Sequence, residues 1–341
     1  MQGDPLLDVA NLQVHFEVYG GVLKVVDGVN MSVRQGEKVG LVGETGCGKT
    51  TTMKAILRVL PDSGRVPGGE ISFMGRDVLS LSPSQLSKIR GTGISMIFQD
   101  PTAALNPVLT VGEQLQTVIA HAAAARGRPL GRRAVHEKAI TSLKEVALAD
   151  PERLLRSYPI QLSGGMRQRV CIGMALATSP ALLIADEPGT SLDVTIQDQI
   201  LRLLQALVSE RHTSVILITH TLGVVRELTD RVYVMYAGNM VETARTPKLF
   251  SESSHPYTQA LLKTVPKLTG GGIATGIPGY IPDYMNPPSG CRFHPRCPFV
   301  MDICRAQKPP AFRIDDGHQA ACFLYAERPT VTAVSQGGPT L

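Results

Sequence analysis

Residues 43–50 read GETGCGKT, a spacing of glycines, lysine and threonine that can wrap a phosphate group. The glycines allow a tight backbone turn that directs successive N–H groups at phosphate oxygens. Lys49 would reach the β- and γ-phosphates, and the Thr50 hydroxyl would contact Mg²⁺. The pattern predicts a site for ATP or GTP that is formed by Gly43, Glu44, Thr45, Gly46, Cys47, Gly48, Lys49, Thr50 and Thr51. We call residues 43–50 the phosphate loop.

The segments on either side of the phosphate loop are those that such a loop needs. A short apolar run at 39–42 precedes it, and residues 51–57 can form a helix. The positive end of that helix dipole would lie at the bound phosphate. A chance glycine-rich turn is the alternative, but spacing, lysine and flanking elements all favour the phosphate site.

A pair of carboxylates follows a second apolar run. Asp186 and Glu187 come directly after residues 182–185, which read as a buried strand. Asp186 could hold Mg²⁺ through water, and Glu187 could orient or deprotonate an attacking water. This pattern is weak by itself and much stronger downstream of a phosphate loop.

Residues 162–169, LSGGMRQR, carry the decisive information. Ser163, Gly164 and Gly165 could form a second anion site at a helix start, or Ser163 could be a plain helix cap. The whole string resembles the signature motif of ABC ATPases, with Met166 in the usual glutamine position. Together with the phosphate loop and Asp186-Glu187, it identifies the chain as a member of that family.

The resemblance implies roles for further residues by their order in the chain. Gln99 matches the glutamine that contacts Mg²⁺ and water, and His220 matches the histidine that touches the γ-phosphate. Ser191-Leu192-Asp193 matches the D-loop, and Phe16 occupies the position of the aromatic ring that stacks on adenine, with Tyr19 as its competitor. The expected catalytic residues are Lys49, Gln99, Glu187 and His220, and the expected Mg²⁺ ligands are Thr50, Gln99 and Asp186.

The signature motif implies a second ATPase subunit. In the family, ATP is closed between the phosphate loop of one subunit and the signature of another. Ser163, Gly164 and Gly165 would thus contact the ATP of a partner, and Asp193 would line the same interface.

Two further strings resemble the oligopeptide and dipeptide importer branch of the family, and in particular its D-type ATP-binding subunits. These are FQDPTAALNP at 98–107 and HPYTQALL at 255–262. The sequence departs from the pattern of this branch only in minor ways. Among these departures, only Thr221, next to His220, could alter how the His220 side chain is held. The resemblance implies an ATPase of a peptide translocase. Related ATPases that serve oligosaccharide, nickel-chelate or glutathione importers remain alternatives. A DNA-repair or translation ATPase of the family would need a long coiled-coil insertion or a second ATPase cassette. This sequence shows neither feature, which disfavours that alternative.

The composition changes after about residue 250, where Pro and Gly become dense and four cysteines appear. The spacing of Cys291, Cys297, Cys304 and Cys322 matches neither a zinc ribbon nor a bacterial ferredoxin. Four thiolates in a loop-rich segment still suggest a metal or cluster that holds the segment together. The family resemblance implies a 4Fe-4S iron-sulfur cluster, with zinc and free or oxidised thiols as alternatives. A rival function makes this module a redox sensor, with ATP hydrolysis secondary. Cys171 reads as core.

These observations predict an α/β fold of the ABC P-loop type. We expect a RecA-like mixed-sheet core, an antiparallel β subdomain and a helical subdomain at about 100–165, within an ATP-binding domain at 1–250. The C-terminal oligopeptide-transporter module with its four cysteines would span 251–341. A stripe at Val135, Ala139, Leu143 and Val146 should be core.

Charge and hydropathy limit the partners. The chain has 34 Lys and Arg against 29 Asp and Glu, a net charge of +5, which is too mild for a dedicated nucleic-acid binder. It shows no secretory signal and no apolar run of the roughly 18–20 residues that span a bilayer. We therefore expect a chain that is soluble by itself, with any membrane role supplied by a partner. The resemblance implies a peripheral protein at the cytoplasmic face of the inner membrane. The resemblance implies a second, paralogous ATPase, two transmembrane permeases and an extracytoplasmic binding protein as partners.

Overall fold

The computed structural model describes residues 4–190, 192–264 and 276–331. The fold divides into two compact units, which are described separately below. The first unit comprises 1–34, 38–80 and 218–341, and the second comprises 35–37 and 81–217. The expected C-terminal module thus packs with the N-terminal strands and the phosphate loop in one unit.

The first unit contains an antiparallel sheet, as the sequence predicts. Its strands lie in the order β2 (Gly21–Val33), β1 (Leu7–Val18), β4 (Gly64–Phe73) and β5 (Arg76–Asp77). Along β1, Leu7 and Val9 are buried, and so are Leu12 and Val14, because alternate side chains face the core. An irregularity between Val9 and Leu12 shifts this alternation by one residue.

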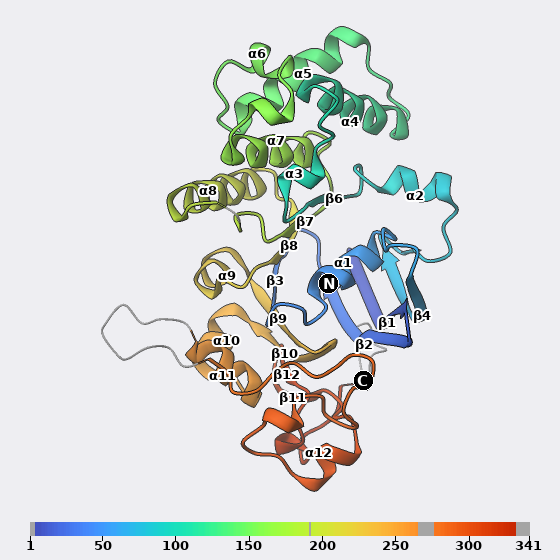
Figure 1. Cartoon of the computed structure of the whole chain (residues 1–341), viewed down its shortest axis with the longest axis vertical. Helices are drawn as coiled ribbons and strands as arrows, with labels where there is room; N and C mark the ends of the chain where they lie inside the picture. The colour runs from blue at the N-terminus through green and yellow to red at the C-terminus, as the bar shows by residue number, and fades with distance from the viewer. Residues whose placement is uncertain (1–3, 191, 265–275, 332–341) are drawn as a thin grey trace. The chain divides into compact units, whose positions relative to one another are not determined.

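A second sheet in this unit joins the strand before the phosphate loop to the C-terminal strands (Figure 1). Strand β3 (Lys38–Val42) pairs in parallel with β9 (Arg231–Tyr236), which forms a hairpin with β10 (Asn239–Arg245). Strands β12 (His318–Ala320) and β11 (Phe312–Asp315) continue the sheet from β10. The helical elements of the unit are α1 (Lys49–Ile56), α9 (Leu222–Leu228), α10 (Thr246–Glu252), α11 (Pro256–Lys263), α12 (Asp302–Ala306), η2 (His294–Arg296) and η3 (Phe323–Tyr325).

The second unit combines a small sheet with many helices. Strand β6 (Ile94–Ile97) pairs in parallel with β7 (Leu182–Asp186), and β8 (Ser214–Ile218) lies next to β7. The helical elements are α2 (Pro83–Ile89), α3 (Pro101–Ala104), α4 (Val111–Ala125), α5 (Arg132–Glu145), α6 (Pro151–Leu155), η1 (Pro159–Gln161), α7 (Gly164–Leu176) and α8 (Val194–Glu210).

The predicted helical stripe lies in the core of the second unit. Val135, Ala139, Leu143 and Val146 are all buried, which confirms the interpretation of their spacing. Cys171 on α7 is buried as well, and burial raises the pKa of its thiol to about 12.

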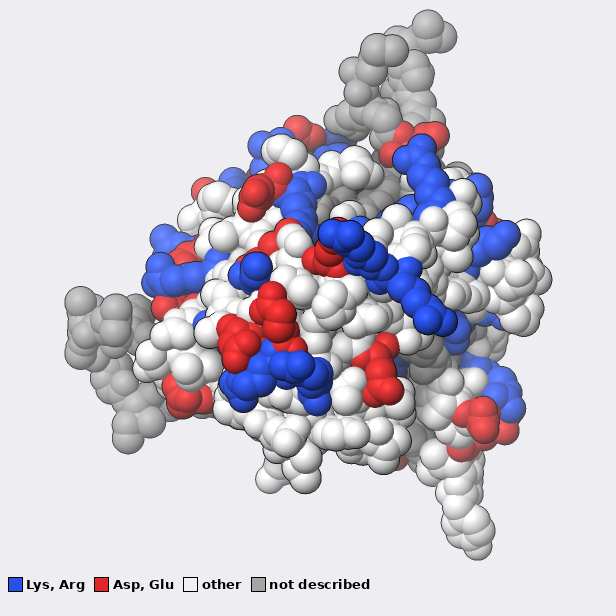
Figure 2. Space-filling model, turned by 90° about the horizontal axis from the view of Figure 1, so that it is seen from above, with Lys and Arg blue, Asp and Glu red and all other residues white. Residues whose placement is uncertain are grey.

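Within the described residues, no helix has both the length and the apolar character to cross a bilayer. On the face seen in Figure 2, Lys and Arg side chains interleave with Asp and Glu instead of forming one field of a single sign.

Candidate nucleotide site

The phosphate loop connects β3 to α1 in the first unit, in the predicted strand–loop–helix arrangement. Gly43 and Gly48 have φ values of 152° and 107°, which residues other than glycine rarely adopt. A Cβ atom at Gly43 would lie 2.1 Å from the Met235 carbonyl oxygen. The motif therefore requires glycine at Gly43 for space as well as for backbone conformation.

Lys49 is only 6% exposed and lies folded against the loop that precedes it. Its Nζ donates to the carbonyl oxygens of Gly43 at 2.8 Å and Glu44 at 3.0 Å, and it lies 3.7 Å from Cys47 Sγ. Burial raises the pKa of the Cys47 thiol, which favours its neutral form. The structure thus places a fixed positive charge at the loop, where a phosphate would need it.

The two candidates for the adenine contact differ in exposure. Phe16 lies on β1 opposite Gly64 and is half-buried, and an added Cβ at Gly64 would lie 3.2 Å from its ring. Tyr19 is fully exposed in the turn that follows β1. Phe16 is therefore held in place by packing, and its contact with adenine stays a prediction.

In the second unit, the structure brings Gln99 and Glu187 together. Asp186 ends β7 and is 2% exposed, whereas Glu187 has a left-handed φ of 46°. The Glu187 carboxylate accepts from Gln99 Nε2 at 3.1 Å and from Thr190 Oγ1 at 3.0 Å. A strained backbone whose side chain is oriented from two sides is typical of a functional position.

Sequence reasoning missed Thr190. Thr190 lies three residues after Glu187, in the turn that follows β7. A hydroxyl residue at this short distance from the glutamate is a sequence feature that could have indicated its role.

The signature residues open α7. The Ser163 hydroxyl caps this helix by accepting from the Met166 N–H at 3.3 Å. An added Cβ at Gly165 would lie 3.0 Å from a methyl group of Ile196, so space is limited there. Asp193 caps α8 by accepting from Ile196 N–H at 3.0 Å. Ser163 and Asp193 thus have structural roles, and their contact with ATP stays a prediction.

For two further predicted residues, the structure gives no test of the predicted role. His220 is an exposed side chain between β8 and α9. Ser191 lies outside the described residues. The roles assigned to both stay predictions.

The four C-terminal cysteines line one cavity together with apolar side chains such as Phe293, Met301 and Phe323. Burial raises the pKa of the Cys291 and Cys322 thiols to about 11. Within the described part of the chain, however, no group of three or more His, Cys, Asp or Glu residues is arranged to hold a metal ion. The expectation of a 4Fe-4S cluster or zinc is therefore not borne out by these side-chain positions.

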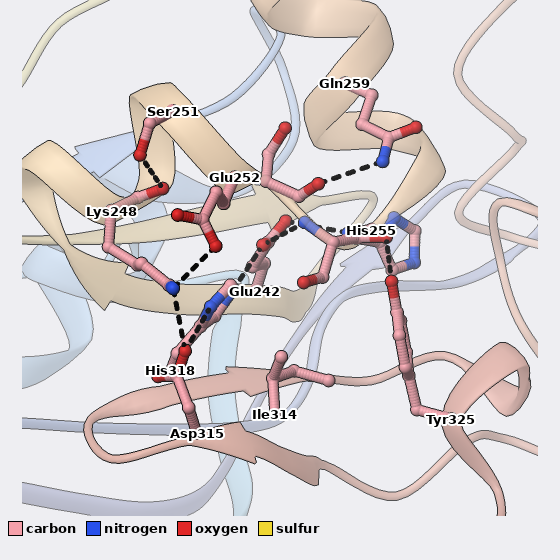
Figure 3. Close-up of polar contacts among 12 residues, drawn as sticks. Glu242, Lys248, Ser251, Glu252, His255, Gln259, Ile314, Asp315, His318 and Tyr325 are labelled. Atoms are coloured by element: carbon pink, nitrogen blue, oxygen red, sulfur yellow. Dashed lines mark hydrogen bonds and ion pairs between the residues drawn. The ribbon is translucent and has the colours of Figure 1, made fainter.

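A buried carboxylate connects β10 to the C-terminal strands (Figure 3). Glu242 accepts from His318 Nε2 at 2.7 Å and from the backbone N–H groups of Ser254 at 2.6 Å and His255 at 3.0 Å. Burial would raise the pKa of Glu242, but these hydrogen bonds outweigh it and lower that pKa. The ionised carboxylate therefore helps to hold α11 and β12 on β10.

Three features together define a P-loop ATPase of the ABC type. They are a phosphate loop on a mixed sheet, a glutamate that a glutamine orients after a parallel strand, and a helix that starts with Ser-Gly-Gly. The family model for the ABC transporter matches residues 26–190, and the model for the oligopeptide/dipeptide transporter C-terminal region matches 241–304. The chain belongs to the family of ABC transporter ATP-binding proteins, whose transport subunits hydrolyse ATP.

Three relatives are similar over nearly their whole length. A probable peptide ABC transporter ATP-binding protein, y4tR of Sinorhizobium fredii, is 49% identical over 325 residues, which cover 94% of this chain and 96% of the relative. The dipeptide transport ATP-binding protein DppD of Bacillus subtilis is 45% identical, with 95% and 96% covered. The oligopeptide transport ATP-binding protein OppD of Escherichia coli is 43% identical, with 96% and 95% covered.

Solved structures confirm the ABC ATPase fold. The ATP-binding cassette MJ0796, in a dimeric post-hydrolysis state with ADP and Pi, matches with a TM-score of 0.62 at 26% identity, covering 70% of this chain and 98% of that chain. The cbiO1 protein of Clostridium perfringens matches with a TM-score of 0.60 at 26% identity, covering 73% and 92%.

Proposed function

We propose that this chain hydrolyses ATP to power an ABC importer of oligopeptides or dipeptides. The observation that carries the peptide assignment is the combination of a matched oligopeptide/dipeptide C-terminal region with relatives named for peptide transport along nearly the whole chain. Import of an oligosaccharide, a nickel chelate or glutathione by the same machinery is the second candidate.

In the proposed mechanism, the phosphate loop holds the phosphates and Glu187 activates the attacking water. Lys49 stabilises the γ-phosphate, and His220 and Gln99 position it and the water. The hydrogen bonds from Gln99 and Thr190 to the Glu187 carboxylate support this assignment, because they leave that side chain little freedom to turn away. Phe16 would stack on adenine.

The oxygen donors of Thr50, Gln99 and Asp186 fit Mg²⁺, which prefers hard oxygen ligands. Bound Mg²⁺ would neutralise phosphate charge. Asp186 is the last residue of the buried strand β7, so this strand fixes the position of its backbone.

The signature residues act on another subunit in this proposal. Ser163, Gly164 and Gly165 would contact ATP held by the phosphate loop of a second ATPase, a paralogue of this chain, with Asp193 at the same interface. Closure on ATP and opening after hydrolysis would then do work on two permeases, because ATP binds the closed dimer more tightly. The complex would include an extracytoplasmic binding protein, and this chain would be peripheral at the cytoplasmic face of the inner membrane.

The four C-terminal cysteines remain our proposed ligands of a 4Fe-4S cluster, with zinc as the alternative. Their convergence on one cavity supports this, although their side chains would have to adjust to bind. Metal binding needs thiolates, and burial raises three of the four thiol pKa values, so cluster formation would release protons. Anaerobic purification tests the proposal: a brown protein supports the cluster, and a colourless, zinc-containing protein contradicts it.

The catalytic assignment is tested in the membrane complex with Glu187→Gln. This variant should bind ATP but lose nearly all turnover, because the amide cannot accept a proton from water. The matched control is Glu137→Gln, the same chemical change at an exposed residue of α5 that pairs with Arg133. Unchanged turnover in Glu187→Gln would refute the assignment.

The substrate class is tested by purifying the complex with its binding protein and identifying the bound ligand. A bound peptide supports the proposal, whereas a sugar, a metal chelate or glutathione assigns the second candidate.

A further inference from the structure

Three side chains from the C-terminal part of the first unit reach the phosphate loop. The Tyr257 hydroxyl accepts from the Glu44 N–H at 2.9 Å, and the Tyr284 hydroxyl donates to the Gly46 carbonyl oxygen at 2.7 Å. Arg296 donates to both oxygens of the Glu44 carboxylate, at 2.8 and 3.1 Å. The phosphate-loop motif requires none of these contacts, and each joins residues more than 200 positions apart.

Two of these side chains, those of Tyr257 and Arg296, are themselves held firmly. Tyr257 packs against Tyr236 and Phe293, with ring centroids 4.6 and 5.4 Å apart. The Arg296 side chain is 4% exposed and lies over the Tyr236 ring, 5.6 Å from its centroid. It also donates to the carbonyl oxygens of Pro278 and Ile277. Because little freedom remains in these side chains, their contacts can fix the loop.

The contacts orient two peptide planes of the loop. In the plane between Gly43 and Glu44, the carbonyl accepts from Lys49 Nζ and the N–H donates to Tyr257. In the plane between Gly46 and Cys47, the carbonyl accepts from Tyr284 and the N–H donates to the Glu44 carbonyl at 3.2 Å. A planar peptide that is hydrogen-bonded at both ends cannot rotate freely, so these contacts restrict the conformation of the loop.

We propose that Tyr257, Tyr284 and Arg296 are positioning residues that preorganise the phosphate loop for ATP. The inference rests on the proposed role of the loop in ATP binding. When only a fraction of the molecules has the loop in its binding-competent conformation, the apparent affinity equals the intrinsic affinity multiplied by that fraction. Side chains that hold it in one conformation remove this loss and cut the ordering cost of binding.

The test measures ATP affinity of the full chain by titration with a fluorescent ATP analogue. Tyr257→Phe and Tyr284→Phe each remove one hydroxyl and keep the ring, and each should weaken binding about fivefold, the factor for ~1 kcal/mol per neutral hydrogen bond. Arg296→Gln should weaken it by about tenfold or more, since its hydrogen bonds are charge-assisted. The matched control is Tyr325→Phe, whose hydroxyl donates instead to the Ser254 carbonyl at 3.0 Å.

Two further readouts separate positioning from a merely structural effect. Hydrogen exchange of residues 43–48 should accelerate in the three variants without nucleotide, while exchange in β3 stays unchanged. In the assembled transporter, KM for ATP should rise while kcat changes little. Since Glu44→Gln and Arg296→Gln remove the same ion pair, the double variant should bind no more weakly than Arg296→Gln alone.

The outcomes distinguish this inference from the proposed function. If the unmodified chain fails to bind ATP, the proposed function fails. If it binds and Tyr284→Phe, Tyr257→Phe and Arg296→Gln bind equally well, the positioning role is refuted. Should Arg296→Gln fail to fold, the two Phe variants still decide the question.

Discussion

Protonation of His255 should loosen the C-terminal module in mildly acidic solution. His255 is 1% exposed, and its Nδ1 accepts from the Tyr257 N–H at 3.0 Å, which caps α11. Burial lowers the pKa of His255 to about 4, against an opposing effect of Glu242. Protonation would convert the cap acceptor into a donor and leave a buried charge.

The direction and size follow from linkage. A histidine whose folded-state pKa lies below its unfolded value of 6.5 stabilises the fold above that value, and this stability is lost as pH falls toward 4. The full difference corresponds to about 3 kcal/mol, of which about 2 kcal/mol should be lost between pH 7 and pH 5. The lowered pKa of Glu242 acts only below its ordinary value of 4.5, so the two effects are separable.

The assay is hydrogen exchange of the backbone amides of residues 257–263, corrected for the intrinsic effect of pH, in the unmodified chain and in His255→Asn. Asparagine can also cap a helix but does not titrate. The opening free energy of α11 should fall by about 2 kcal/mol between pH 7 and pH 5 in the unmodified chain and stay nearly constant in the variant. An equal slope in both proteins would refute the reasoning.

Substitutions at three other positions test the proposed nucleotide-binding and catalytic residues. Gly43→Ala should abolish ATP binding and cost about 1–3 kcal/mol of stability, because its Cβ would meet the Met235 carbonyl oxygen; a titration and a melting curve check both. Thr190→Val should lower kcat several-fold with little change in KM, because Glu187 loses the orienting hydrogen bond from Thr190; steady-state kinetics with equal kcat would contradict this. Ser163→Ala should cost about 1 kcal/mol as a lost helix cap and also lower turnover, whereas Ser163→Asn should restore stability and not turnover. Full activity in Ser163→Asn would show that the cap is the only role of this residue.

The sequence alone predicted the features that depend on neighbouring residues. Local spacing predicted the phosphate loop, the strand that leads into Asp186 and the cap at Ser163. Such patterns are readable because glycine conformations, helix caps and strand periodicity are set within a few residues. The string at 162–169 then identified the family.

Only the tertiary structure decided which distant side chains support the site. Glu187 is held by Gln99, 88 positions away, and the phosphate loop by Tyr257, Tyr284 and Arg296, more than 200 positions away. No local periodicity encodes these contacts. The parallel pairing of β6 with β7 brings Gln99 to Glu187. The contacts to the phosphate loop depend on the path by which β9 and β10 return the chain to β3. The same path explains why His255, which the sequence shows only as part of a family string, becomes a buried cap whose charge the fold excludes.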